Sequence, residues 1–310
     1  MNLIFMGTSP FSVFILEALT SSRFEISAVV TQPDRPGGRG REVLPPPLKK
    51  RAEELGLPVF QPERVNRPEF LEMLQTLFPE VIVVAAFGQI LRSTLLHLPS
   101  RGCVNVHASL LPGYRGADPI RWSILNGERE TGVSIMVMDE GVDTGPILTS
   151  QVVPIEETDQ YRSLERKLGL AGGELLVHTL PLWLNGTIQP VPQEETGTSL
   201  AGKISKEMLR IDWNQPASFI ARQVRAFAPC PGAYFFFRER RMKVLQAWYR
   251  EDDCGRAPGT VVGVDREEGI LVGTGKGVLV IEQIQPENKK ILRFREWCCG
   301  YRIQEGEKFQ

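Results

Sequence analysis

Short apolar runs alternate with segments of helical periodicity through the first part of the chain. Leu3–Met6, Val81–Ala86 and Cys103–Val106 are apolar at successive positions, which is typical of strands buried on both faces of a parallel sheet. Helical spacing is found in Phe11–Leu19, behind a proline suited to a first helical turn, and later in Leu164–Leu184. This alternation predicts an α/β fold with an open, mostly parallel sheet.

The pattern changes after residue 186. Residues 189–202 contain prolines and polar side chains without periodicity, and they are interpreted as a linker between domains. Beyond them come short β-rich runs separated by turn residues, which favours a small OB-like β-barrel. We therefore expect a Rossmann-like domain over residues 1–188 and a C-terminal barrel domain over residues 203–310.

The charge of the chain is nearly balanced overall but unevenly distributed. Its 310 residues include 36 Lys and Arg and 37 Asp and Glu, a net charge of −1. Residues 201–310 carry 19 basic and 14 acidic side chains, a net charge of +5. Residues 1–200 carry 17 basic and 23 acidic side chains, a net charge of −6. Within that acidic part, residues 31–51 carry six basic and two acidic side chains, a net of +4. A basic loop and a basic domain are compatible with contacts to nucleic-acid phosphates.

The cysteine and histidine content argues against a disulfide framework or a metal site. The five cysteines are odd in number, form no C-x-x-C pair and include the adjacent Cys298 and Cys299. Only three histidines are present, so we expect no bound metal. No apolar run reaches the ~20 residues of a membrane span, and no leader precedes the first strand. We expect a cytoplasmic protein with reduced thiols.

Three short motifs suggest other functions but lack the context that those functions need. Residues 7–10, G-T-S-P, follow the first strand without the G-x-G-x-x-G of a dinucleotide site. Residues 272–277, V-G-T-G-K-G, lack the Ser or Thr of a phosphate loop and have strand-like flanks, so a β-turn is favoured. The D-T-G at residues 143–145 is a single copy followed by proline in an otherwise α/β sequence, which disfavours an aspartic protease.

The apolar strand that begins at Cys103 ends with two polar side chains. Asn105 and His107 are two positions apart, so they face the same side of the strand. Ligands of open parallel sheets bind beyond the carboxyl ends of the strands. There an amide can donate a hydrogen bond to a developing oxyanion, and an imidazole can move a proton near neutral pH, as an addition–elimination reaction needs. On this segment alone, a polar strand end with a satisfied histidine is an equally good interpretation.

A second polar segment, D-E-G-V-D-T-G, occupies residues 139–145. Its two glycines, Gly141 and Gly145, permit a tight loop that presents Asp143 toward the same site. A carboxylate beside an imidazole orients the ring and favours its protonated form. Taken alone, such a segment is more often a solvated turn.

Together the two segments resemble the signature of the 10-formyltetrahydrofolate-dependent formyltransferases. That signature is N-V-H-x-S-L-L-P-x-x-R-G followed by D-x-G-x-D-T-G, and both parts occur here in that order. The resemblance implies that Asn105, His107 and Asp143 form a catalytic trio and that 10-formyltetrahydrofolate is the formyl donor. It also implies a folate-binding loop formed by Ser109, Leu110, Leu111 and Pro112.

Nearly the whole chain is similar to the branch of this superfamily that formylates initiator methionyl-tRNA. Residues 31–40, T-Q-P-D-R-P-G-G-R-G, resemble the inserted loop that enters the acceptor arm of the tRNA in that branch. Residues 204–207, 210–213 and 225–227 resemble the start of its barrel-like, tRNA-binding C-terminal domain. The resemblance implies that the partner is initiator methionyl-tRNA and that the enzyme is a monomer. The tRNA contacts that it implies lie in the inserted basic loop, residues 32–47, at Arg35, Arg39 and Arg41.

Three other functions were weighed against this one. A sugar-nucleotide formyltransferase would use the same donor with a similar catalytic trio and C-terminal domain, but the arginine-rich loop favours tRNA. A purine-pathway formyltransferase would leave residues 201–310 unexplained. A non-catalytic RNA-binding protein would have no need of Asn105, His107 and Asp143, and all three are present.

Overall fold

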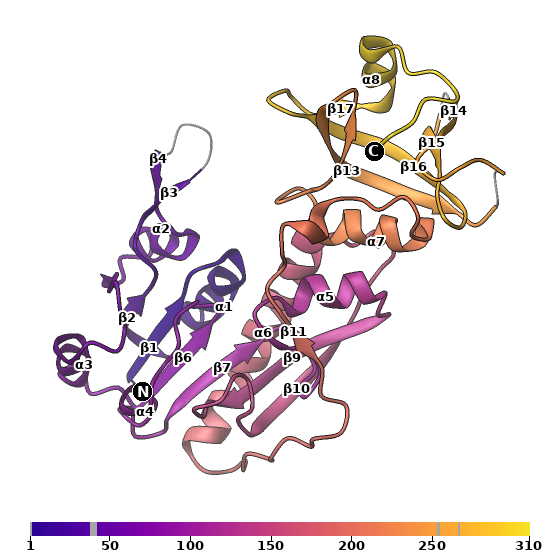
Figure 1. Ribbon diagram of the computed structural model, residues 1–310. Helices are drawn as coiled ribbons and strands as arrows, with labels where there is room; N and C mark the ends of the chain where they lie inside the picture. The colour runs from indigo at the N-terminus through magenta and orange to yellow at the C-terminus, as the bar shows by residue number, and fades with distance from the viewer. Residues whose placement is uncertain (1, 38–41, 253–254, 266) are drawn as a thin grey trace. The chain divides into compact units, whose positions relative to one another are not determined.

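The computed structural model describes residues 2–37, 42–252, 255–265 and 267–310, which divide into two compact units (Figure 1). The N-terminal unit contains the chain up to Pro119 together with Glu130–Pro154 and Leu164–Ala201. The C-terminal unit consists of Ile120–Arg129, Ile155–Ser163 and Gly202–Gln310.

The two short segments of the C-terminal unit come from within residues 1–188, and polar contacts inside that unit hold them. The first contains most of helix α5 (Pro119–Asn126), whose Leu125 carbonyl oxygen accepts a hydrogen bond from Arg222 Nε at 3.1 Å. In the second, Gln160 Nε2 donates to the Leu245 carbonyl oxygen at 3.1 Å. Such contacts cross about 85 to 97 positions of sequence, so local periodicity carries no sign of them.

The N-terminal unit is built on a seven-stranded sheet in the order β10-β9-β7-β6-β1-β2-β5. The five strands from β7 to β5 run parallel to one another, whereas β9 is antiparallel to β7 and β10 is antiparallel to β9. The expected Rossmann-like, mostly parallel sheet is therefore confirmed. The strands are β1 (Asn2–Gly7), β2 (Glu25–Val30), β5 (Val59–Phe60), β6 (Val81–Ala85), β7 (Cys103–His107), β9 (Glu130–Val137) and β10 (Ile147–Pro154).

Helices connect these strands and bury the apolar residues of the sheet. The long helix α6 (Tyr161–Leu184) approaches the sheet closely at Gly172, because a Cβ there would lie 3.0 Å from Val106 and 3.1 Å from Val133. Central strand residues such as Ile4 and Ile82 are completely buried. The other helices are α1 (Pro10–Thr20), α2 (Pro47–Glu54), α3 (Pro68–Gln75) and α4 (Ser93–Leu96).

The inserted loop, expected to be unperiodic over residues 32–47, contains a short antiparallel hairpin. Its strands β3 (Arg35–Gly37) and β4 (Glu42–Leu44) pair in register, with Arg35 opposite Leu44. Three-residue strands are too short to produce a recognisable alternation, which is why the sequence shows no sign of them. The predicted tRNA-binding residues Arg39 and Arg41 lie outside the described residues.

The C-terminal unit contains a six-stranded antiparallel sheet in the order β12-β13-β16-β15-β14, with β17 paired to β16. The segment 306–310 joins its two edges: Phe236 of β12 exchanges backbone hydrogen bonds with Gln310, and Val261 of β14 does so with Gly306 and Glu307. The backbone ladder thus continues around the sheet, as in a barrel. The strands are β12 (Ala233–Phe237), β13 (Arg240–Arg250), β14 (Val261–Asp265), β15 (Gly269–Gly273), β16 (Val278–Pro286) and β17 (Leu292–Arg293).

Aromatic side chains fill the interior of this barrel. The rings of Phe235 and Phe309 stack with centroids 4.5 Å apart, and Trp297 packs against both. Trp297 belongs to helix α8 (Phe294–Tyr301), which the sequence does not predict because its eight residues include a Gly and two Cys, all of low helix propensity. Helix α7 (Ala217–Phe227) precedes the barrel strands and follows the 3₁₀ turn η1 (Glu207–Leu209). None of the described helices has the length and apolar character needed to cross a membrane.

Candidate active site

Strand β7 ends with buried polar side chains where the parallel part of the sheet meets its antiparallel part. Asn105 pairs with Val84 of β6 on one side and Met136 of β9 on the other. Asn105 is 9% exposed and His107 is 6% exposed, so both are nearly removed from water. Burial of such polar groups costs free energy unless they have partners, and a water-poor site strengthens the interactions they make. The partners come from two loops.

The first loop follows β9 and carries Asp143. Its carboxylate accepts a hydrogen bond from Asn105 Nδ2 at 3.3 Å and one from the backbone N–H of Gly116 at 2.9 Å. Asp143 has a φ of 54°, a left-handed conformation that is costly for a residue with a Cβ. Two positions on, Gly145 allows the loop to lie against β9, because a Cβ there would lie 1.9 Å from the Val137 carbonyl oxygen.

Both ring nitrogens of His107 face oxygen acceptors. Nδ1 lies 3.6 Å from Asp143 Oδ2, and Nε2 lies 3.0 Å from the carbonyl oxygen of Tyr114. A carbonyl and a carboxylate can only accept, so a ring nitrogen that interacts with either of them does so as an N–H donor. The structure therefore brings Asn105, His107 and Asp143 into one cluster, as the two sequence motifs suggested.

The predicted folate-binding residues form the second loop, between β7 and β8 (Arg115–Gly116). Ser109 is fully buried and its hydroxyl donates to the Gly113 carbonyl oxygen at 2.7 Å, so this side chain stabilises the loop. Ser134 of β9 accepts from the Leu111 backbone N–H at 3.0 Å and donates to the Ser109 carbonyl oxygen at 2.9 Å. Leu111 is also buried, whereas Leu110 and Pro112 are partly exposed.

Sequence reasoning missed one residue that contacts this cluster. Gln193, in the stretch interpreted as a linker, donates from Nε2 to the carbonyl oxygens of Asp143 and Gly145 at 2.8 and 2.7 Å. Its Oε1 accepts from Arg115 Nε and Nη2 at 3.0 and 2.7 Å. Arg115 was visible in the signature, but a lone Gln in a Pro-rich stretch has no distinguishing pattern. Within the described residues, no group of three or more His, Cys, Asp or Glu is arranged to hold a metal.

Comparison with known proteins identifies the family of the chain. The family model "Formyl transferase" matches residues 1–180, and "Formyl transferase, C-terminal domain" matches residues 203–302. The methionyl-tRNA formyltransferase of Dictyoglomus turgidum is 44% identical over 313 residues, covering 100% of this chain and 99% of its own. That of Myxococcus xanthus is 44% identical over 307 residues, covering 99% and 97%. The chain belongs to the methionyl-tRNA formyltransferase family.

Solved structures of other proteins share the fold at lower identity. The sugar 3N-formyl transferase WlaRD, solved in the presence of dTDP and 5-N-formyl-THF, is 20% identical, with a TM-score of 0.65 over 94% of this chain and 99% of its own. HypX from Aquifex aeolicus, solved in complex with tetrahydrofolic acid, is 18% identical, with a TM-score of 0.68 over 100% of this chain and 50% of its own. At these identities the likeness concerns the fold alone.

The described part of the inserted loop borders a pocket of the N-terminal unit. Arg35 is exposed and lines a pocket of about 510 Å³ with Thr8, Gln32 and Phe87, at the carboxyl ends of β1, β2 and β6. The preceding Asp34 accepts hydrogen bonds from Gln61 and Lys49, which hold the pKa of its carboxyl below the ordinary value. Lys49 is therefore already paired within the loop region, and Arg35 supplies positive charge at the pocket.

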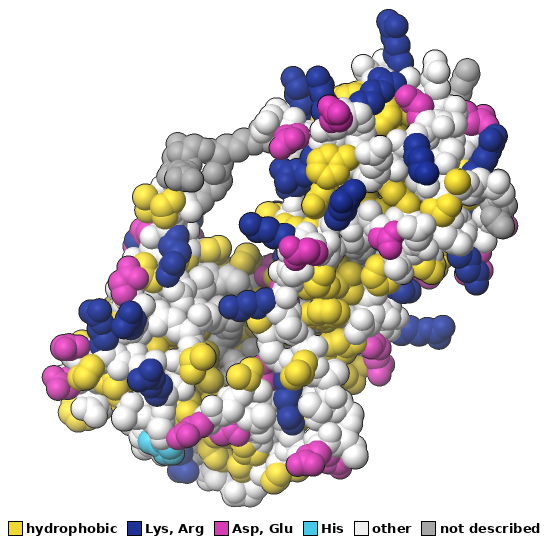
Figure 2. Space-filling view, in the orientation of Figure 1, with side chains coloured by type: hydrophobic (Ala, Val, Ile, Leu, Met, Phe, Trp, Pro, Cys, Tyr) yellow, Lys and Arg dark blue, Asp and Glu magenta, His cyan; other side chains and the backbone are white. Residues whose placement is uncertain are grey.

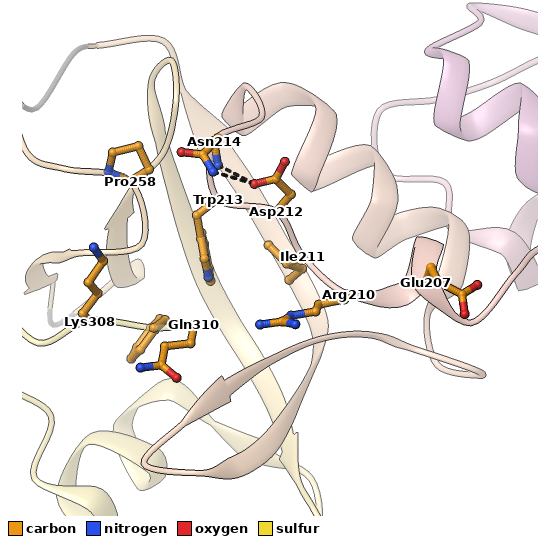
Figure 3. A pocket seen from close by; sticks show the side chains of 10 residues that line it. Glu207, Arg210, Ile211, Asp212, Trp213, Asn214, Pro258, Lys308 and Gln310 are labelled. Carbon is orange, nitrogen blue, oxygen red and sulfur yellow. Dashed lines mark hydrogen bonds between the residues drawn. The ribbon is translucent and has the colours of Figure 1, made fainter.

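The C-terminal unit has a pocket of about 500 Å³ beside its barrel (Figure 3). Arg210 and Lys308 lie on either side of Trp213 in that view, and the indole N–H of Trp213 has no hydrogen-bond partner in the part of the chain that is described. The Asp212 carboxylate accepts from the backbone and side-chain nitrogens of Asn214 at 3.0 and 2.9 Å, and these hydrogen bonds lower its pKa.

The outer face of β12 and β13 carries aromatic and basic side chains. Along β12 they alternate with residues whose side chains point into the core. Tyr234 and Phe236 are partly exposed, with ring centroids 5.7 Å apart, while their neighbour Phe235 points into the core. Arg241 lies 5.7 Å from the Tyr234 ring centroid, and Arg210 lies 5.7 Å from that of Phe236. Figure 2 shows Lys and Arg side chains spread over the visible face of this unit with hydrophobic side chains between them.

Proposed function

We propose that the enzyme transfers the formyl group of 10-formyltetrahydrofolate to the α-amine of initiator methionyl-tRNA. The observation that carries the proposal is the buried cluster of Asn105, His107 and Asp143 at the end of β7, in which the Asp143 carboxylate lies 3.3 Å from the amide and 3.6 Å from the imidazole. Family membership over the whole chain supports the reaction type and the methionyl-tRNA acceptor. A translation-initiation substrate implies a cytoplasmic enzyme.

In this reaction the neutral α-amine attacks the formyl carbon, which forms a C–N bond and converts the carbonyl oxygen into an oxyanion. Asn105 Nδ2–H and a His107 N–H are the donors for that oxyanion. Collapse of the intermediate breaks the bond between the formyl carbon and N10 of the folate. The proton lost by the amine reaches N10 through His107 and solvent, so the products are formylmethionyl-tRNA and tetrahydrofolate.

Asp143 supports both donors from one position. Its carboxylate holds the Asn105 amide by a hydrogen bond and faces His107 Nδ1, so it orients both side chains. The Tyr114 carbonyl oxygen occupies the other side of the ring. The substrate oxygen would have to replace this carbonyl as the acceptor at Nε2.

We assign folate binding to the loop from Ser109 to Pro112, in which exposed and buried residues have different roles. Leu110 and Pro112 keep exposed surface for contact with the ligand. Ser109 and Leu111 are buried, so we expect them to act by shaping the loop backbone.

For the tRNA we assign two contact regions, one in each unit. In the inserted loop, Arg35 carries a positive charge at the pocket. The sequence of the same loop contains two further arginines, Arg39 and Arg41. In the C-terminal unit, Tyr234 and Phe236 offer ring faces for unpaired bases, and Arg241 adds charge for phosphates.

The deciding experiment compares three acceptors in one assay. The purified chain is incubated with 10-formyltetrahydrofolate and with initiator methionyl-tRNA, elongator methionyl-tRNA or an amino-sugar nucleotide, and formylated product is measured by mass spectrometry. We expect transfer to initiator methionyl-tRNA, weaker transfer to the elongator tRNA, and none to the sugar. Transfer to the amino-sugar nucleotide but not to tRNA would establish the sugar-nucleotide alternative instead.

A further inference from the structure

Residues 191–201, here called the strap, cross the catalytic loops of the N-terminal unit after helix α6. At one end, Val191 and Ile147 exchange backbone hydrogen bonds of 2.8 Å, directly after the Asp143 loop. At the other end, β11 (Leu200–Ala201) pairs in parallel with β8, and the Ser199 hydroxyl accepts from the Tyr114 backbone N–H at 2.8 Å. The strap is thus attached on both sides of the catalytic cluster.

Gln193 lies in the middle of the strap and uses its whole hydrogen-bonding capacity there. Its two amide protons go to the carbonyl oxygens of Asp143 and Gly145, and its oxygen accepts two N–H groups of Arg115. Carbonyl oxygens only accept and a guanidinium only donates, so the orientation of the Gln193 amide is determined by these partners. Arg115 thus orients the Gln193 amide, and this amide in turn holds the backbone of the Asp143 loop.

The Asp143 loop needs such an external support. The hydrogen bonds within the loop involve Asp139, whose carboxylate accepts from the Gly141 N–H and the Thr144 hydroxyl, and they leave the Asp143 carbonyl to Gln193. Asp143 itself has a φ of 54°, which persists only where surrounding contacts hold it. If the carbonyl of Asp143 turns, its carboxylate moves away from Asn105 and His107.

We infer that Gln193 is a positioning residue of the formyl-transfer reaction, which holds the Asp143 carboxylate against Asn105 and His107 from the strap. The inference rests on the proposed catalytic role of Asp143. Gln193 acts through the backbone of Asp143 and Gly145 and takes no part in binding the two substrates, so its loss lowers kcat and leaves both KM values near those of the unaltered enzyme.

The test substitution is Gln193→Glu, which keeps size and the acceptors for Arg115 but replaces both donated hydrogen bonds with a carboxylate oxygen facing two carbonyls. A displacement of about 1 Å in a catalytic group can cost about 100-fold in rate, and we expect a fall of that size in kcat. Gln189→Glu makes the same chemical change at an exposed position two residues before the strap and is the matched control. If Gln193→Glu unfolds the chain, Gln193→Met provides an uncharged substitution without the donors.

A double-mutant cycle separates positioning from a general structural role. In an Asp143→Ala background the placement of the carboxylate no longer matters, so adding Gln193→Glu produces no further loss of kcat. Additive losses, or kcat of Gln193→Glu equal to that of Gln189→Glu, would overturn the inference. A failure of the proposed function is distinguishable, because in that case the unaltered chain forms no formylmethionyl-tRNA and Asp143→Ala changes nothing.

Discussion

The proposed catalytic cluster and the outer face of the C-terminal barrel differ in how deeply their side chains are buried. At the cluster, Asn105 and His107 are nearly buried and each has a defined partner. On the barrel, Tyr234 and Phe236 are partly exposed and meet arginines only at the longer distances of cation–π contacts. Bond-making chemistry requires a few groups held in place before the substrate arrives, whereas affinity for an RNA accumulates over many exposed, individually weak contacts.

The largest effect we expect is a loss of stability caused by a substitution inside the barrel, in the core that supports its outer face. Phe235→Ala removes a fully buried ring that contacts Trp213, Trp297 and Phe309, and should lower the free energy of unfolding of the C-terminal unit by about 3–5 kcal/mol. Tyr234→Ala, one position along on the opposite face, should cost far less. Denaturant titrations followed by tryptophan fluorescence compare the two variants. Equal losses of unfolding free energy in Phe235→Ala and Tyr234→Ala would show that the inner and outer faces of β12 do not differ in this way.

A slightly smaller effect should result from a substitution in the proposed catalytic cluster. This substitution should lower the reaction rate and not the stability. Asn105→Ala removes one oxyanion donor, which typically costs about 2.7–4 kcal/mol, or about 10²–10³ in kcat. Because the group acts on the transition state, KM for both substrates and the salt dependence should change little. Steady-state kinetics at two salt concentrations measure this, with the exposed Asn185→Ala as control. Near-normal turnover of Asn105→Ala would remove Asn105 from the mechanism.

Substitutions on the outer face should give the reverse kinetic signature. Tyr234→Ala should weaken tRNA binding by about 1–3 kcal/mol if an unpaired base stacks on the ring, with kcat preserved. Arg241→Ala should lower the slope of log K against log salt by about 1 if the guanidinium contacts a phosphate. Filter binding over a salt series gives both quantities. An unchanged tRNA affinity in both variants would place the RNA contact elsewhere on the unit.

The smallest effect distinguishes buried from exposed thiols. Burial raises the pKa of Cys103, on β7 two positions before Asn105, to about 12, so at pH 8 its reactive thiolate is almost absent. Cys230 and Cys299 are exposed. Iodoacetamide at pH 8 should therefore alkylate Cys230 and Cys299 in the native protein and spare Cys103, as peptide mapping would show. Rapid labelling of Cys103 would mean that the strand bearing the catalytic residues opens in solution.

Much of the fold and the positions of two of the three proposed catalytic residues could be inferred from local patterns. Continuous apolar runs revealed the central strands because both of their faces are buried, and the spacing of Asn105 and His107 placed them on one side of β7. Asp143 entered through a motif rather than through periodicity, and the structure now shows its carboxylate beside both residues. The hairpin in the inserted loop and helix α8 escaped detection because elements of three to eight residues carry too little pattern.

The sequence by itself determined the alternation of the main strands and helices in the first domain, the position of the polar strand end and the family to which the chain belongs. Only the tertiary structure showed that Gln193, fifty positions beyond Asp143, holds the loop that carries it, and that residues 306–310 join both edges of the barrel sheet. The physical reason is the same in both cases. Periodic burial leaves a trace in neighbouring residues, whereas a hydrogen bond between distant, unperiodic segments exists only after the chain has folded.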